Sequence, residues 1–104
     1  MVNPRAGEVS VAIDGEAHRC KLTLGALSEL EASLGEPSLL SLVQRFESGK
    51  FSTNDVMAVI VAGLRGGGWK GKPEDLLNAD IEGGAIGAAK GAAMLLARAF
   101  ATPE

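Results

Sequence analysis

The chain has 104 residues, 46% of them hydrophobic, and a formal net charge of −3. This length predicts a single domain, residues 1–104, and the mildly acidic balance argues against direct binding to nucleic acid. The single cysteine, Cys20, excludes an internal disulfide and fits a reducing compartment. The first ten residues lack the apolar segment of a signal peptide, and charged residues interrupt the longest apolar tract, residues 81–101. We therefore expect a cytoplasmic protein without membrane contact.

Residues 7–22 predict a β-hairpin that follows a short disordered lead, residues 1–6. The apolar residues Val9, Val11 and Ile13 stand at every second position, as in a strand with one buried face. Asp14-Gly15, which follows them, is a favoured pair for a type I′ turn. With these two residues in the loop, the predicted pairs are Ile13–Glu16, Val11–His18 and Val9–Cys20. All apolar residues of the first strand then share one face, which helices must cover because an isolated hairpin is only marginally stable.

The rest of the chain, residues 23–101, predicts helices, so the expected fold is mainly α within the α+β class: a hairpin and a bundle of four to five helices. The first helix lies in LTLGALSELEASLG, where Thr23 suits the N-cap and Gly35 the end. Its leucines recur at helical spacing and predict a buried stripe, Leu24, Leu27, Leu30 and Leu34.

Two further helices follow. Pro37 suits the first position of the second helix and Gly49 its end, and its apolar residues are Leu39, Leu42, Val43 and Phe46. In the third helix, Ser52 with Asp55 resembles a capping box, and Phe51 with Val56 resembles a hydrophobic staple. Its expected buried stripe is Val56, Val59, Ile60 and Leu64, and three glycines, residues 66–68, end it.

A short helical turn is predicted over Pro73 to Ala79, and Asp80 can cap a final helix over residues 81–101. Gly83, Gly87 and Gly91 stand four residues apart and form a smooth face on which another backbone could pack closely. Each such glycine weakens a helix by roughly 1 kcal/mol relative to alanine, so close packing or a bound partner must compensate. We expect this face to bind a partner helix while the larger apolar residues of the second half dock on the core, namely Met94, Leu95, Leu96 and Phe100.

The loop GGGWKGK, residues 66–72, matches the GxxxxGK pattern of phosphate-binding P-loops. The match fails at two points, because Pro73 replaces the hydroxyl residue that binds magnesium and a helix, not a strand, is predicted before the loop. A small phosphate- or nucleotide-binding protein remains an alternative from another class. Trp69 either folds back as an anchor, which we favour, or is exposed as a hot spot for binding a partner.

His18 and Cys20 share one strand face, but one His and one Cys supply neither a complete metal site nor an oriented catalytic pair. We interpret them as a half-buried histidine and a small apolar cysteine beneath the helices. No catalytic, metal-binding or cofactor-binding residues are predicted, and a non-enzymatic protein is expected.

The chain resembles the small tail-gene family of bacterial gene transfer agents, which are phage-like particles. The resemblance covers roughly residues 7–101 and rests on LTLGALSELEASLG, FSTNDVMAVIVAGLRGGG and IEGGAIGAAKGAAMLLARAF. The family is labelled a tail tube protein or grouped with phage tail assembly chaperones. The resemblance implies a non-enzymatic role in building a tail, in a gene transfer agent or a prophage, with the tape measure and tail tube proteins as partners.

Two roles within such a tail are open. A tail assembly chaperone would offer a groove to an amphipathic helix of the long tape measure protein. A tail tube component would be incorporated in the particle, and would be expected to contribute a larger sheet than one hairpin. Self-association is possible in either role.

Overall fold

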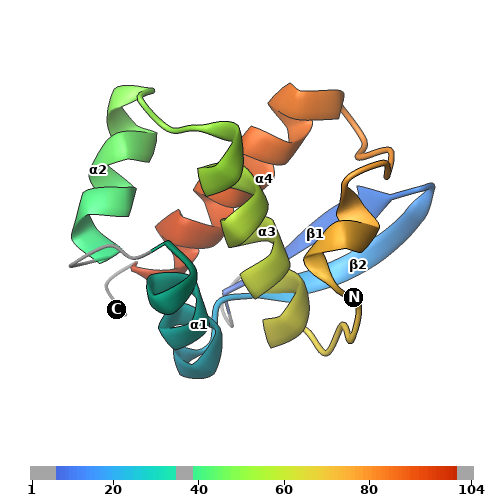
Figure 1. The fold of residues 1–104 in the computed structure, drawn as a ribbon, viewed down its shortest axis with the longest axis horizontal. Helices are drawn as coiled ribbons and strands as arrows, with labels where there is room; N and C mark the ends of the chain where they lie inside the picture. Colours follow the sequence, from blue (N-terminus) through green and yellow to red (C-terminus); the bar gives the residue numbers. More distant parts are fainter. Residues whose placement is uncertain (1–6, 35–38, 101–104) are drawn as a thin grey trace.

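The computed structural model describes residues 7–34 and 39–100 of the chain. In these described residues, a two-stranded antiparallel sheet precedes four α-helices and one 3-10 turn, which confirms the predicted class (Figure 1). The elements are β1 (Glu8–Ile13), β2 (Glu16–Lys21), α1 (Leu24–Leu34), α2 (Leu39–Ser48), α3 (Thr53–Gly66), η2 (Pro73–Leu76) and α4 (Gly84–Ala99). The predictions for residues 1–6, Gly35, Pro37 and Ala101 lie outside the described residues. Within them, no helix is both long and apolar enough to cross a membrane.

The hairpin has the predicted register, with Ile13 opposite Glu16, Val11 opposite His18 and Val9 opposite Cys20. Asp14 and Gly15 adopt φ values of +52° and +79°, as a type I′ turn requires at both central positions. The face that carries Val9, Val11 and Ile13 is buried. The turn pair and the alternating pattern therefore fix this element locally.

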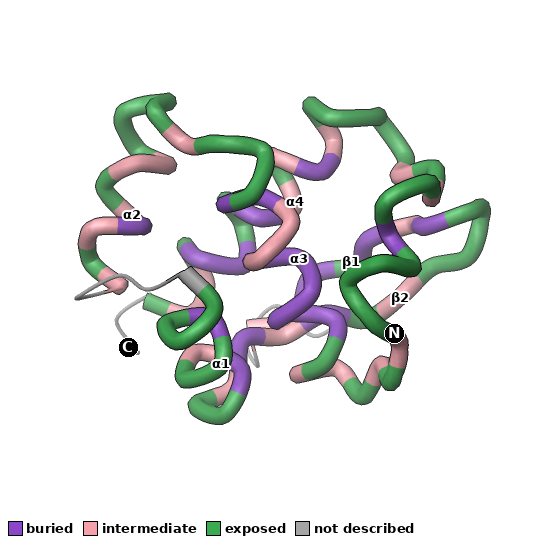
Figure 2. Tube along the Cα trace, viewed as in Figure 1, coloured by how far each residue is buried: buried purple, intermediate pink, exposed green. Residues whose placement is uncertain are grey.

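Helix α3 runs through the centre of the molecule and is buried over most of its length (Figures 1 and 2). It packs against α1, β2 and α4, which surround it. The predicted stripe of Val56, Val59, Ile60 and Leu64 is buried, and so are Val61, Ala62 and Gly63 on the other sides of the helix. The predicted capping box is present, because Ser52 Oγ accepts from the Asp55 N–H at 3.1 Å while Asp55 Oδ2 accepts from the Ser52 N–H at 2.9 Å.

An ion pair joins α2 to the start of α3. Arg45 donates from Nε and Nη2 to the two carboxylate oxygens of Asp55, at 3.1 and 2.9 Å. Burial acts to raise the pKa of Asp55, but the hydrogen bonds from Arg45 and Ser52 and the charge of Arg45 outweigh it and hold this pKa below its ordinary value. The rings of Phe46 and Phe51 stack nearby with centroids 4.7 Å apart. Asp55 therefore caps α3 and also binds α2 through Arg45.

One predicted core residue is wrong: Leu24 is 86% exposed. The buried face of α1 carries Ala26 and Leu30, with Leu27 partly buried. Ala26 lies over Gly66 of α3, where small side chains let the two helices approach closely, and this contact sets the rotation of α1. Leu24, two positions earlier on the helix, then points away from the core. Thr23 does cap the helix, since its Oγ1 accepts from the Ala26 N–H at 3.1 Å.

The predicted start of the final helix is also wrong, because α4 begins at Gly84 and Asp80 does not cap it. Instead, the Asp80 N–H donates to Asp14 Oδ1 at 2.8 Å, and the Asp14 N–H donates to the Asp80 carbonyl at 2.7 Å. Ile81 forms an antiparallel bridge with Ile13. Residues 80–82 thus extend along β1 before the helix starts, and these long-range hydrogen bonds replace the local cap.

The second half of α4 docks on the core through Leu95 and Leu96, as predicted, whereas Met94 and Phe100 are 44% and 48% exposed. The first half of the helix contributes only small side chains to the core, of which Ala88 is buried. The large apolar residues of α4 are therefore divided between the core and the surface.

We expect Leu30→Ala to lower the free energy of unfolding by about 2–5 kcal/mol, because it removes a side chain that is 1% exposed. Leu24→Ala should change it by less than about 0.5 kcal/mol, since Leu24 is already in water. Urea denaturation of both variants measures this. Equal losses would contradict the orientation of α1.

The lowered pKa of Asp55 predicts a pH-dependent contribution to stability. An unfolded aspartate titrates near pH 3.9, so the contribution is complete above that pH and is lost as the pH falls through the lower folded-state pKa. We expect Asp55→Asn to lower the free energy of unfolding by roughly 1–3 kcal/mol at neutral pH. Urea denaturation between about pH 5 and about pH 2 should show the two proteins converging. A constant difference would exclude Asp55 as the titrating group.

Candidate partner-binding groove

A groove of about 680 Å³ lies between the outer edge of β1 and helix α4. Its border carries Ile86 and Met94, which are 71% and 44% exposed and lie on one side of α4 with Lys90 between them. Gly83, Gly87 and Gly91 also line it. The structure therefore brings the predicted glycine face and two exposed apolar side chains into one concave surface.

The close packing predicted for the glycines is made within the chain. A Cβ atom at Gly87 would lie 2.1 Å from the carbonyl oxygen of Glu82, and one at Gly91 would lie 3.4 Å from Val11 Cγ2. Gly83 has φ of +83° and turns the chain into α4, where L side chains are strained. The glycines thus allow α4 to cross β1 closely, and their role in binding a partner stays a prediction.

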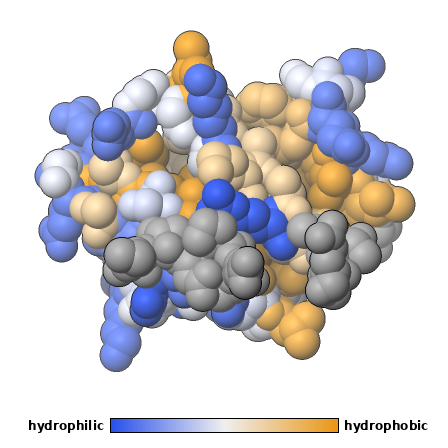
Figure 3. All heavy atoms as spheres, turned by 180° about the vertical axis from the view of Figure 1, so that it is seen from behind, coloured by the Kyte–Doolittle hydropathy of each residue, from blue (hydrophilic) through white to orange (hydrophobic). Residues whose placement is uncertain are grey.

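The groove has charged residues along its α4 side. Lys90 is exposed in the middle, and Arg98 at the far end donates from Nη1 to the Glu8 carbonyl. Glu82 lies at the opposite end. Seen from behind, where α4 and the hairpin face the viewer, pale apolar areas adjoin hydrophilic side chains (Figure 3). This combination suits a partner that is apolar and carries an acidic group.

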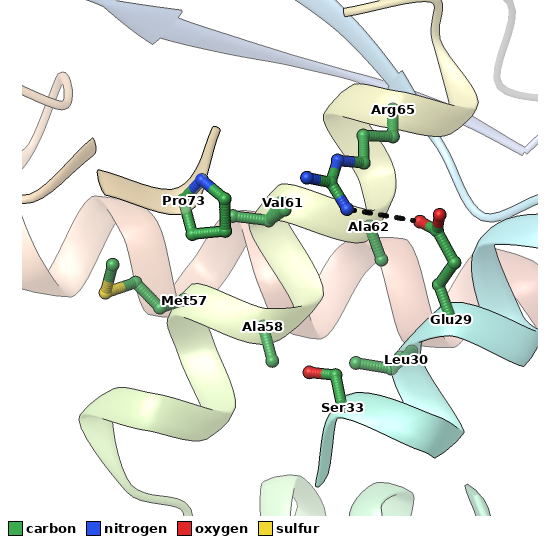
Figure 4. Close-up of a pocket in the computed structure, with 9 residues that line it drawn as sticks. All are labelled: Glu29, Leu30, Ser33, Met57, Ala58, Val61, Ala62, Arg65 and Pro73. Atoms are coloured by element: carbon green, nitrogen blue, oxygen red, sulfur yellow. Dashed lines mark ion pairs between the residues drawn. The ribbon is translucent and has the colours of Figure 1, made fainter. Parts of the chain in front are cut away.

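A second, smaller groove of about 280 Å³ lies between α1 and α3 (Figure 4). Leu30, Ala58 and Val61 line it, and Met57 and Pro73 lie at one side. An ion pair between Arg65 Nη1 and Glu29 Oε2, at 3.6 Å, lies across one end. Leu30 and Val61 are already buried, so this groove offers a partner less exposed apolar surface than the one beside α4.

The glycine loop does not form a phosphate cradle. The N–H groups of Gly67, Gly68 and Trp69 donate to carbonyls in the last turn of α3, which leaves them unavailable to an anion. Helix α3 precedes the loop, and the 3-10 turn η2 follows it. Trp69 is partly buried against the core, with its ring beside Gly71, which favours the anchor interpretation. Binding of a partner by Trp69 stays a prediction.

The two reactive residues of the hairpin occupy the places expected of structural residues. Cys20 is fully buried, and burial raises the pKa of its thiol to about 11, so the nucleophilic thiolate is suppressed. His18 is half-buried beside it on the same strand. In the described part of the chain, no group of three or more His, Cys, Asp or Glu residues could hold a metal ion.

Residues 6–102 match the family described as "Phage tail tube protein, GTA-gp10". The chain belongs to this family. It is therefore a tail-related protein of phages or gene transfer agents, as the resemblance implied. No curated protein and no solved structure matches the chain.

Sequence reasoning missed two parts of this groove. It did not identify Ile86 as a surface residue, because only the packing of α4 shows that this side chain is exposed. It also missed the outer edge of β1 as one wall, because nothing local to the hairpin indicates which segment lies beside it. The spacing of Ile86 and Met94, eight residues apart, is the one pattern that could have indicated a second apolar stripe.

The contact between Gly87 and Glu82 makes a prediction about the glycine face. Gly87→Ala should lower the free energy of unfolding by about 1–3 kcal/mol, because its Cβ must displace the Glu82 carbonyl. The matched control is Gly25→Ala in α1, where the nearest atom to a Cβ is Thr23 Oγ1 at 3.9 Å. That change should raise stability by up to about 1 kcal/mol, as alanine is the better helix former. Thermal denaturation measures both, and a stabilising Gly87→Ala would refute the contact.

Proposed function

We propose that this protein is a tail assembly chaperone that binds a segment of the tape measure protein in the groove between β1 and α4. The observation that carries the proposal is the pair of exposed apolar side chains, Ile86 and Met94, at the border of a concave surface. Isolated exposed apolar residues are common, but two on the same side of one helix beside a groove are typical of an interface. Family membership supplies the biological setting.

The role as a structural tail tube component is the competing proposal, and it agrees with the description of the family as a tail tube protein. The small size of the sheet argues against it. The described residues contribute one two-stranded hairpin and the short bridge at Ile81. Burial of its inner face under α3 and α4 leaves the two edges and the outer face of this sheet for lateral contacts. A cytoplasmic chaperone would be absent from purified particles, whereas a tube component would be abundant there.

The nucleotide-binding alternative has no support from the geometry of the loop. The N–H groups of Gly67 and Gly68 are bonded to carbonyls of α3, and the position after Lys72 is a proline within η2. A non-enzymatic binding protein agrees better with a buried, protonated Cys20.

Ile86→Glu should weaken binding to the tape measure protein at least about tenfold, because a charge replaces an exposed apolar contact. The matched control is Leu24→Glu, which also places a glutamate in the first turn of a helix but lies outside the groove. Both variants should melt within a few degrees of the wild type. Isothermal titration of the purified proteins measures the affinities. Equal binding by both variants would exclude the groove.

A further inference from the structure

The outer edge of β1 carries backbone groups in a regular alternation. On this edge, the carbonyl of Glu8 accepts from Arg98, the carbonyl of Ala12 accepts from the Glu82 N–H at 3.0 Å, and the Asp14 N–H donates to Asp80. In an antiparallel pair, every second residue directs both its backbone groups away from the partner strand. Ser10 lies midway between Glu8 and Ala12, so its N–H and carbonyl also point outward, into the groove that it lines.

The chain itself already uses half of this edge as a strand-pairing site. Residues 80–82 run antiparallel to β1 and form the bridge between Ile81 and Ile13. The chain then leaves the edge at Gly83 and Gly84, whose φ values are +83° and +64°. The part of the edge at Ser10, between Glu82 and Arg98, has no strand beside it among the described residues. Such an edge is a template for another extended segment.

We infer that the groove binds its partner as an added β-strand, in which an extended segment of the tape measure protein pairs with Ser10 of β1. This inference rests on the proposed function and specifies how the partner is recognised. The segment continues the line of residues 80–82 and exchanges two backbone hydrogen bonds with Ser10. A bound helix satisfies its own backbone groups internally, so it would cover the N–H and carbonyl of Ser10 without pairing them.

The walls of the groove define the chemistry of this segment. Alternate side chains of a strand point to opposite faces, so one set faces α4 while the other faces solvent. The α4 side presents Ile86 and Met94 with Lys90 between them. The partner is therefore a short extended segment with apolar residues facing α4 and an acidic residue opposite Lys90.

Ser10→Pro tests the inference directly. Proline removes the outward N–H of Ser10 and blocks strand addition, yet it removes no hydrogen bond between β1 and β2. Ser10→Ala keeps the N–H and removes only the exposed hydroxyl. With the tape measure protein as the probe, Ser10→Pro should lose affinity at least about tenfold, whereas Ser10→Ala binds as the wild type does. Wild-type affinity of a folded Ser10→Pro variant would overturn the inference.

Amide hydrogen exchange on the wild-type protein gives a second measurement that needs no variant. In the free protein the Ser10 amide should exchange rapidly, whereas those of Val11 and Ile13, which bond to β2, are protected. Addition of the tape measure protein should slow exchange at Ser10 about tenfold or more. If exchange at Ser10 does not slow when the protein is saturated with the tape measure protein, strand addition is overturned. Slowing that depends only on the concentration of this protein would also overturn it, because it would indicate pairing of two copies.

Failure of the inference and failure of the proposed function can be told apart. If the wild type does not bind the tape measure protein, the proposed function fails and the inference fails with it. A different result separates the two. If the wild type binds and Ile86→Glu weakens that binding, but the Ser10 amide stays unprotected, then the groove is the site and the partner is not an added strand.

Discussion

The last turn of α3 packs directly against the backbone of β2. A Cβ atom at Gly66 would lie 1.8 Å from the carbonyl oxygen of Lys21, and one at Gly67 would lie 1.8 Å from that of Arg19. No residue with a side chain fits at these two positions without a shift of the backbone, so the contact depends on glycine. Because α3 is the helix against which α1, β2 and α4 all pack, this close approach determines where the hairpin lies relative to every other element.

The same principle governs the crossing of α4 over β1. Gly91 brings the helix close to Val11, and Leu95 fills the space beside Gly63 of α3. The larger residues of α4 that are buried lie in its second half, so its first half approaches the sheet through glycine and alanine alone. The groove beside the outer edge of β1 runs along this thin half and on past Met94, and both Ile86 and Met94 are left outside the core.

The chemistry of the chain agrees with a protein that works by binding. Its cysteine is buried with a raised pKa, and in its glycine loop the N–H groups of Gly67, Gly68 and Trp69 donate to carbonyls at the end of α3. The buried carboxylate, Asp55, is fully engaged by Arg45 and Ser52, which explains it as a structural residue. Membership in a phage tail family and a groove with an apolar border are the two facts from which the chaperone proposal is built.

Much of the local structure was determined by the sequence alone. The register of the hairpin followed from Asp14-Gly15 and the alternation beside it, and the start of α3 followed from Ser52 and Asp55. The turn and the cap each depend on residues at most a few positions apart in the chain. The types of those residues are therefore sufficient to predict them. The family was likewise evident from sequence patterns.

The tertiary structure decided which faces are buried and where the final helix begins. Helical spacing identified an apolar stripe on α1, but a contact between Ala26 and Gly66 rotated the helix so that Leu24 faces water. Asp80 had the right residue type for a cap, yet its backbone bonds to Asp14, 66 positions away in the chain, and the helix starts later. The groove, too, joins β1 to α4 from opposite ends of the sequence. These features depend on which segments meet in space, and a pattern within one segment cannot encode the surface of its neighbour.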